Sequence, residues 1–263
     1  MAKKVIFNDL VSIECDDSLR TCINEIAETI KYVITQFKSV MKKKNIKELC
    51  PYPITILIEN RDFPMIIPSP SVANKRIIYL CAVDSYWNQY AYQFAHEFCH
   101  YIIDGPLDGK CETSFWFEES ICELASRFFL YRLYHTLSRH NNKASNNLKN
   151  YAKFFKDYAD NKMPEGDRKI DCELKVWIQN NIKNLTTVPA EENRGSYGLI
   201  AKELLPIFEE IPVLWNILPY IKRLPQQQYI DFRTFISKTV ANSIQQSSSQ
   251  LFQAYSTLSN LLV

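Results

Sequence analysis

Residues 76–104 read RIIYLCAVDSYWNQYAYQFAHEFCHYIID, and the spacing of the apolar residues changes within this stretch. Residues 76–83 are rich in apolar and β-branched side chains and follow a turn rich in Pro and Ser, which predicts a strand. From Asp84 onward the apolar residues recur at helical spacing, until Gly105 and the proline after it end the pattern. The stretch therefore predicts a strand followed directly by a long helix.

The segments around this stretch predict a small sheet and many helices. Residues 16–44 are patterned as a helix, residues 54–59 as a second strand and Met65–Ile67 as a short edge strand. Another helix is expected near 115–135. Further helices are expected at roughly 148–162, 171–184, 196–209, 211–222 and 228–262. The predicted class is α+β, with a small N-terminal mixed sheet packed on the helix that carries HEFCH and a mainly helical C-terminal half.

The composition is that of an ordinary globular protein. The chain has 263 residues, of which 46% are hydrophobic, and 31 basic residues against 29 acidic ones give a net charge of +2. This balance gives no support for a nucleic acid or an anionic membrane as partner. The phosphate-binding motifs GxGxxG and GxxxxGK[ST] do not occur, and no apolar run approaches the roughly 18–20 residues of a membrane span.

The N-terminus and the cysteines predict a cytoplasmic protein. Asn8 and Asp9 interrupt the apolar run that a secretory signal would need. The eight cysteines include no CxxC pair, so reduced and mostly buried thiols are expected. The sequence does not predict an oligomeric state.

The residues that carry chemistry are concentrated in HEFCH, residues 96–100. Four residues turn an α-helix by about 400°, so His96 and His100 project from one face and can bind one Zn²⁺ together. Zinc lowers the pKa of a bound water from about 15.7 towards 7. Glu97 lies within reach of such a water and can act as the general base. The alternative is a helix that merely carries two histidines. Half of the four histidines of the chain lie in this pentapeptide, which favours the zinc site.

A hydrolytic zinc site needs a third protein ligand and one open position. His135 and His140 are candidates, but the pattern HExxHxxGxxH is absent from the chain. The better candidate lies in the segment SFWFEESICELAS, residues 114–126.

The WFEES segment, residues 116–120, together with HEFCH resembles the gluzincin metallopeptidases. The resemblance implies that Glu119 is the third zinc ligand, with Glu118 as the alternative. It also implies that Glu123 accepts the free N–H of His96 and fixes its tautomer. The same resemblance implies an oxyanion donor near a glycine in a later helix, for which Tyr197 and Arg194 are the candidates.

The resemblance covers residues 76–128, and the GxMEN motif of the gluzincin aminopeptidases is missing. AHEFCH, residues 95–100, also resembles the ImmA/IrrE family of regulatory metallopeptidases, more weakly. In the gluzincins the strand before the active-site helix borders the cleft and pairs with the substrate backbone.

These observations predict a cytoplasmic zinc metallopeptidase that holds one zinc ion per chain and hydrolyses a peptide or protein substrate. Residues 1–140 are expected to form a zincin-like catalytic core, and residues 141–263 a helical half that completes the cleft. The alternative function is a regulatory or binding module with a zincin fold and little or no general proteolysis. A structural zinc protein is a third, weaker alternative. The natural substrate and the cleavage preference are not predicted.

Overall fold

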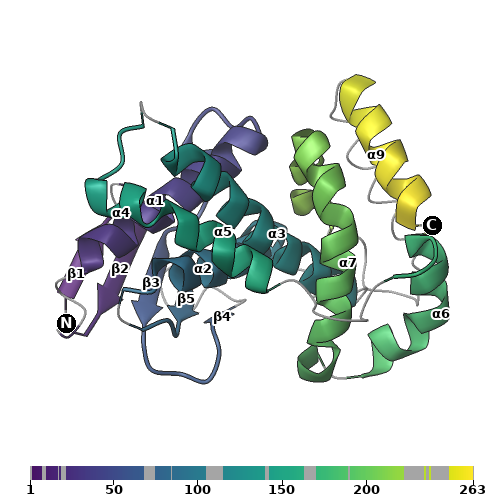
Figure 1. The fold of residues 1–263 in the computed structure, drawn as a ribbon, viewed down its shortest axis with the longest axis horizontal. Helices are drawn as coiled ribbons and strands as arrows, with labels where there is room; N and C mark the ends of the chain where they lie inside the picture. The colour runs from purple at the N-terminus through teal and green to yellow at the C-terminus, as the bar shows by residue number, and fades with distance from the viewer. Residues whose placement is uncertain are drawn as a thin grey trace. The chain divides into compact units, whose positions relative to one another are not determined.

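The computed structural model has an α+β architecture, with a five-stranded mixed sheet near the N-terminus and helices in most of the remaining chain (Figure 1). This confirms the class predicted from the sequence. The residues that the structure describes are 2–7, 10–16, 18, 22–67, 75–83, 85–104, 115–139, 142–162, 170–188, 190–221, 234, 237 and 249–262.

The sheet has a parallel centre and two antiparallel outer strands. Its order is β1-β2-β3-β5-β4, and β2, β3 and β5 run parallel while β1 and β4 are antiparallel to their neighbours. The strands are β1 Ala2–Val5, β2 Val11–Cys15, β3 Ile54–Ile58, β4 Met65–Ile66 and β5 Arg76–Leu80. In the three parallel strands every second residue is buried, so one face of the sheet packs on the core.

Three expectations about the sheet need correction. The strands β1 and β2 were not predicted, although the buried Val11, Ile13 and Cys15 alternate as a strand requires. The strand expected over residues 76–83 ends at Leu80, because the side chain of Gln93 on the next helix accepts the Cys81 N–H at 3.0 Å. The strand before the HEFCH helix, which the gluzincin resemblance gives as the strand that pairs with a substrate, is β5. It already pairs with both β3 and β4, so the outermost strand on that side is β4.

The helices of the first 162 residues include the two long helices that the sequence predicted around HEFCH and WFEES. They are α1 Ile23–Val40, the 3₁₀ helix η3 Ile46–Glu48, α2 Trp87–Asp104, α3 Phe115–Leu137, α4 Asn146–Asn150 and α5 Ala152–Asn161. The helix expected over 16–44 is shorter, because Lys42 takes a positive φ of 51° that ends helical geometry. The helix expected over 148–162 is divided at Tyr151 into α4 and α5.

The later helices differ from their predicted bounds. They are α6 Leu174–Thr187, α7 Ala190–Glu210, the 3₁₀ helix η4 Pro212–Tyr220 and α9 Ser249–Leu262. The segment expected as an α-helix over 211–222 is a 3₁₀ helix that contains Pro212 and Pro219, which lack the N–H that an α-helix uses. Of the helix expected over 228–262, most of residues 228–248 lies outside the described residues.

Contacts divide the chain into two compact units that are interleaved in sequence. The first comprises Met1–Ile102 and Ala125–Lys162, and the second comprises Ile103–Leu124 and Met163–Val263. The boundary expected between residues 140 and 141 therefore falls inside the first unit, ahead of α4. The second unit has its own packing, in which the rings of Phe208 and Trp215 lie 4.9 Å apart.

The core of the first unit joins α1 to α2 and α3 through three phenylalanines. The ring of Phe37 on α1 lies edge-on to that of Phe98 at 5.1 Å and stacks on that of Phe129 at 3.8 Å, and all three side chains are fully buried. Beside them, Gln36 donates to the Thr136 hydroxyl and accepts from Arg132, both at 2.9 Å. These contacts fix α1 against both α2, the helix that carries HEFCH, and α3.

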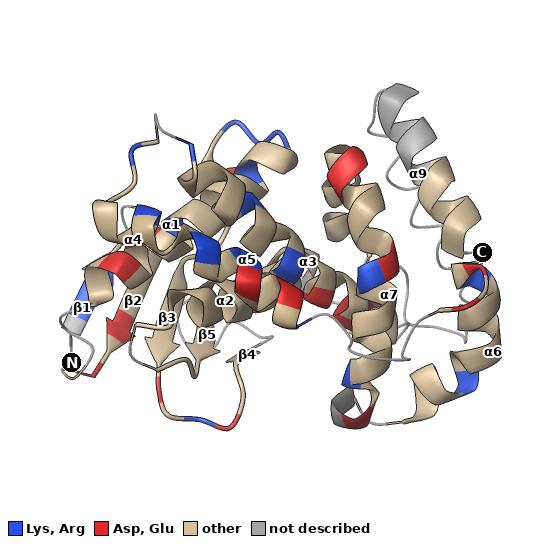
Figure 2. Cartoon of the chain, in the orientation of Figure 1, with Lys and Arg blue, Asp and Glu red and all other residues tan. Residues whose placement is uncertain are grey.

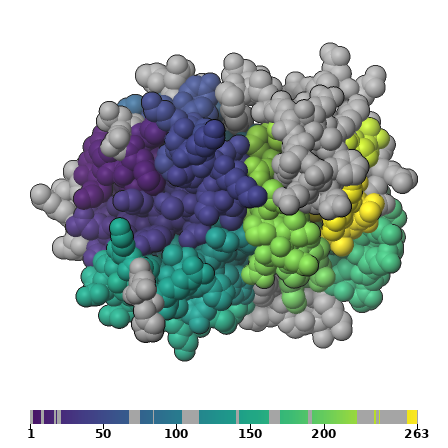
Figure 3. Space-filling view, turned by 90° about the horizontal axis from the view of Figure 1, so that it is seen from above, coloured from purple at the N-terminus to yellow at the C-terminus, as the bar shows by residue number. Residues whose placement is uncertain are grey.

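Further contacts hold α1 to the segment that begins α4. The carboxylate of Glu28 accepts the backbone N–H of Ser145 at 2.9 Å, and that of Glu25 accepts from the Asn147 side chain at 3.0 Å. In Figure 3 the teal residues of α4 and α5 accordingly lie beside the violet residues of α1.

Acidic and basic residues are interspersed along α1, α5 and α7 (Figure 2). In the part of the chain that is described, no helix combines the length and apolarity that a bilayer crossing needs.

Replacing Phe37 by Ala is expected to destabilise the protein by about 3–5 kcal/mol, because it leaves a cavity where three helices meet. The measurement is urea unfolding followed by circular dichroism. Phe154→Ala is the matched control, since that ring is 53% exposed and its loss is expected to cost about 0.5 kcal/mol or less. A cost below about 1 kcal/mol for Phe37→Ala would contradict the packing described here.

Among the described residues no disulfide bond is recorded. Cys15, Cys50, Cys99 and Cys122 are buried and Cys172 is exposed; Cys22 and Cys81 are half-buried. For those residues this agrees with the expectation of reduced, mostly buried thiols, while Cys111 lies outside the described part. Burial raises the pKa of the Cys50 thiol to about 12, so it stays protonated in the neutral range.

We expect iodoacetamide at pH 8 to alkylate Cys172 and to leave Cys50 unmodified in the native protein. The reagent reacts with the thiolate, and a raised pKa keeps Cys50 in the thiol form well above pH 8. Peptide mass spectrometry after timed alkylation checks this, and unfolding in urea should make the two cysteines equally reactive. Similar native rates for both would show that Cys50 is not enclosed.

Candidate metal centre

The two histidines of HEFCH lie one helical turn apart on α2. Their ring centroids are 5.0 Å apart, and His100 is buried while His96 is partly exposed. Phe94 and Phe98 stack at 5.2 Å on the apolar side of the same helix. Because successive residues turn by about 100°, that side lies roughly opposite the histidines. Packing of the phenylalanines therefore turns both imidazoles away from the core of the first unit.

α3 brings the third residue of the site. The hydroxyl of Ser126 donates to the backbone carbonyl of Tyr92 on α2 at 3.0 Å. Tyr92 lies one turn before His96, and Glu119 lies two turns before Ser126 on the same face of α3. The two helices are therefore antiparallel: Ser126 lies beside Tyr92, and Glu119, earlier on α3, lies beside the histidines, later on α2.

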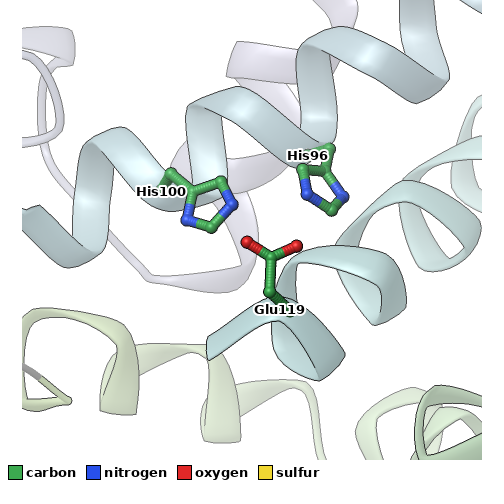
Figure 4. Close-up of side chains that lie close together, drawn as sticks. All are labelled: His96, His100 and Glu119. Atoms are coloured by element: carbon green, nitrogen blue, oxygen red, sulfur yellow. The ribbon is translucent and has the colours of Figure 1, made fainter. Parts of the chain in front are cut away.

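His96, His100 and Glu119 form a cluster that could hold a metal ion. Each residue offers one ligand atom, and these atoms all lie within 4.8 Å of one another. Figure 4 shows both imidazoles on one helix turned towards the Glu119 carboxylate on the other. The three ligands expected from the sequence and its resemblance are therefore brought together.

The other ligand candidates are placed differently. Glu118, the alternative to Glu119, is 5% exposed and does not belong to the cluster. His135 is exposed in the last turn of α3, about 24 Å along the helix from Glu119 at 1.5 Å per residue. His140 lies outside the described residues.

Glu97 faces the end of β5. Its side chain is 5% exposed, and it follows Gln93 by one helical turn. Gln93 accepts the Cys81 N–H at 3.0 Å and donates to the Cys81 thiol at 3.3 Å. Burial raises the pKa of that thiol, and the carboxylates of Glu97 and Asp62 raise it further. Gln93 and Cys81 were not predicted as neighbours of Glu97; the signal in the sequence was the four-residue spacing from Gln93 to Glu97.

Glu123 lies on α3 one turn beyond Glu119 and is partly exposed. This places it along the helix towards the level of His96, because α2 and α3 are antiparallel. Its expected role as the acceptor of the His96 N–H stays a prediction.

The two candidates for an oxyanion donor lie inside α7. The helix was expected to begin near residue 196, with Tyr197 at its start, but it begins at Ala190. Asn193 explains the longer helix, since its side chain donates to the carbonyls of Asn184 at 2.9 Å and Val188 at 3.2 Å and so satisfies the end of α6. Tyr197 is buried and Arg194 is exposed. The role of either residue stays a prediction.

No protein-family model, curated protein or solved structure matches this chain. The resemblance to the gluzincins therefore rests on HEFCH, WFEES and the residues near them, and the site is interpreted from its own geometry.

Proposed function

We propose that this chain is a zinc-dependent metallopeptidase. The observation that carries the proposal is the convergence of His96, His100 and Glu119, whose ligand atoms lie within 4.8 Å of one another. Two imidazole nitrogens and one carboxylate oxygen are the donors that zinc takes in catalytic His₂Glu sites, where a fourth position stays open. Glu97 belongs to the same helix and supplies the general base.

The spacing of the three donors supports this assignment. Ligands of a tetrahedral zinc ion at about 2.1 Å are about 3.4 Å apart. Donor atoms that already lie within 4.8 Å reach that spacing by small rotations of the side chains. The mixed nitrogen and oxygen donors suit zinc better than magnesium or calcium, which prefer oxygen ligands alone.

Each of three residues has a separate role in the proposed reaction. When bound, zinc supplies Lewis acidity that polarises the scissile carbonyl and lowers the pKa of a water. Glu97 takes a proton from the attacking water while the water oxygen bonds to the carbonyl carbon. Glu97 then passes that proton to the amine nitrogen when the C–N bond breaks. Glu123 holds the His96 ring by accepting its free N–H, and Tyr197 is the proposed donor to the oxyanion.

The proposed substrate is a peptide or an unfolded protein segment in extended form. Such a segment binds by adding to the edge of a sheet, where main-chain hydrogen bonds hold it independently of sequence. Because β5 pairs on both sides, β4 is the outermost strand next to it and is the strand proposed to receive the substrate.

The test is digestion of reduced, carboxymethylated casein by the zinc-loaded protein, with products identified by mass spectrometry. We expect cleavage that 1,10-phenanthroline stops and added zinc restores. Absence of cleavage from casein and from a panel of native and unfolded proteins, with zinc still bound, would overturn the peptidase assignment. That result would favour the regulatory or binding module.

A further inference from the structure

Five lysines lie in one short turn where α1 ends and the chain passes into η3. The backbone N–H of Lys43 donates to the carbonyl of Lys38 at 3.0 Å, and that of Lys42 to the carbonyl of Ser39 at 3.1 Å. Figure 2 shows blue along this connection. Residues 38–47 are called the basic turn below, and its lysines are Lys38, Lys42, Lys43, Lys44 and Lys47.

The basic turn has no paired counter-charge within the described part of the chain. Three of its lysines are exposed and two are half-buried, and none of the five makes an ion pair there. Glu48, the acid that directly follows, is bonded to Asn45, whose side chain donates to its carboxylate at 3.0 Å and accepts its backbone N–H at 3.1 Å. Successive Cα atoms are about 3.8 Å apart, well inside the Debye length of roughly 8 Å, so the lysines of the turn repel one another.

Lys42 occupies a backbone position that favours glycine. Its φ is 51°, and no other non-glycine residue in the described ranges has a positive φ. The hydrogen bonds of Lys42 and Lys43 to the last turn of α1 are those of a Schellman motif, in which this position is usually Gly because a Cβ is unfavourable there. Folding alone would favour glycine at position 42 and fewer like charges beside it. The lysine is therefore evidence of a role other than folding.

The chemistry of the basic turn favours an acidic protein segment over a nucleic acid or a membrane. Its cations are all lysines, which lack the fork that arginine offers to phosphate, and no aromatic residue lies within 38–47 to stack on a base. Lasting attachment to a bilayer needs a second signal besides charge, but Val40 and Met41 are buried in the core. A large polyanion would also meet the mixed charges of the rest of the chain, whereas a short segment meets only the lysines.

We propose that the basic turn docks an acidic segment of a partner protein, a run of Asp and Glu whose carboxylates pair with the five lysines. Charge complementarity carries the choice of partner, since such a segment removes the repulsion within the turn. The inference goes beyond the proposed function and does not depend on it, because no residue of the basic turn belongs to the metal cluster.

The test is binding of two fluorescein-labelled peptides to the full chain, one of eight glutamates and one of eight glutamines, measured by fluorescence anisotropy. We expect the glutamate peptide to bind at least about tenfold more tightly, since several exposed ion pairs of modest strength form together. This advantage should shrink as salt is added, because the pairs are exposed and are screened.

The variant Lys42→Gln/Lys43→Gln/Lys44→Gln should weaken binding of the glutamate peptide about tenfold and leave casein cleavage and zinc content unchanged. The matched control is Lys143→Gln/Lys149→Gln/Lys153→Gln, which removes the same charge from the region of α4 and α5 and should keep the affinity within about twofold. Circular dichroism reports the folding of both variants.

The variant Lys42→Gly separates docking from a structural role. It should raise the urea midpoint, because glycine fits the positive φ, and at the same time weaken binding of the glutamate peptide several-fold. Unchanged binding in this variant would overturn the assignment of Lys42.

Three results would overturn the docking site as a whole. They are equal binding of the two peptides to the wild type, equal loss of affinity in the two triple variants, and binding to vesicles instead of the peptide. The vesicles contain phosphatidylcholine and phosphatidylserine in equal amounts, and co-sedimentation that depends on Lys42–Lys44 in the absence of peptide binding would assign the turn to a membrane. Failure of the peptidase proposal changes none of these measurements, because they need neither zinc nor turnover.

Discussion

Replacing Glu97 by Gln is expected to abolish peptide hydrolysis while zinc stays bound. Gln has nearly the same size and shape as Glu and fits the same buried position on α2, but its amide cannot accept the proton of the attacking water. Loss of a general base typically lowers the rate by about 10²–10⁴-fold. The measurement is the rate of casein cleavage together with the zinc content of the same preparation.

Glu118→Gln is the matched control for this prediction. Glu118 is as deeply buried as Glu97, with 5% of its surface exposed, and lies outside the metal cluster. The same substitution there should leave the rate within a few-fold of the wild type. Activity of Glu97→Gln within a few-fold of the wild type would rule out Glu97 as the base and would move that role to another group.

Replacing Glu119 by Ala is expected to weaken zinc binding more than any other change on α3. It removes the only carboxylate of the cluster and leaves two imidazoles, which hold zinc less well than three ligands. The loss should exceed the roughly 10–100-fold that removal of an outer hydrogen-bond partner costs. Competition with a chromogenic chelator measures the affinity of each variant.

Glu118→Ala is the comparison that separates a ligand from a nearby charge. Both glutamates lie in the first turns of α3, where the helix dipole favours a carboxylate whether or not a metal is bound. Successive residues point about 100° apart, so only one of the two can face the histidines. Equal loss of zinc in both variants would mean that the effect is unfolding of the helix start rather than removal of a ligand.

The helices that carry the site were predictable because their signals are local. Strict helical spacing and the Gly-Pro pair after Asp104 define α2, and an apolar segment of the same kind defines α3. The four-residue spacing of the histidines is a property of the helix itself. The prediction of Glu119 as a ligand depended on the resemblance to the gluzincins. Helical spacing alone does not give the register of α3 against α2, which depends on contacts such as that of Ser126 with Tyr92.

The remaining differences arise where a structure depends on distant partners. β2 is only five residues long and is stabilised by pairing with β3, some 40 residues later, so its alternation alone was a weak signal. The start of α7 depends on Asn193 reaching the end of α6. The missing hydrogen bond at the buried Nη1 atom of Arg76, within the described part of the chain, is likewise a property of the packed structure, since a strand residue in sequence does not show what surrounds it.

The zinc content of the purified wild-type protein, determined by plasma mass spectrometry before and after incubation with zinc, tests whether this cluster is a metal site at all. About one tightly held zinc ion per chain is the expected result, and it would justify the search for a substrate. No zinc even after incubation would mean that HEFCH is a helix that merely carries two histidines, and the peptidase proposal would fall with it.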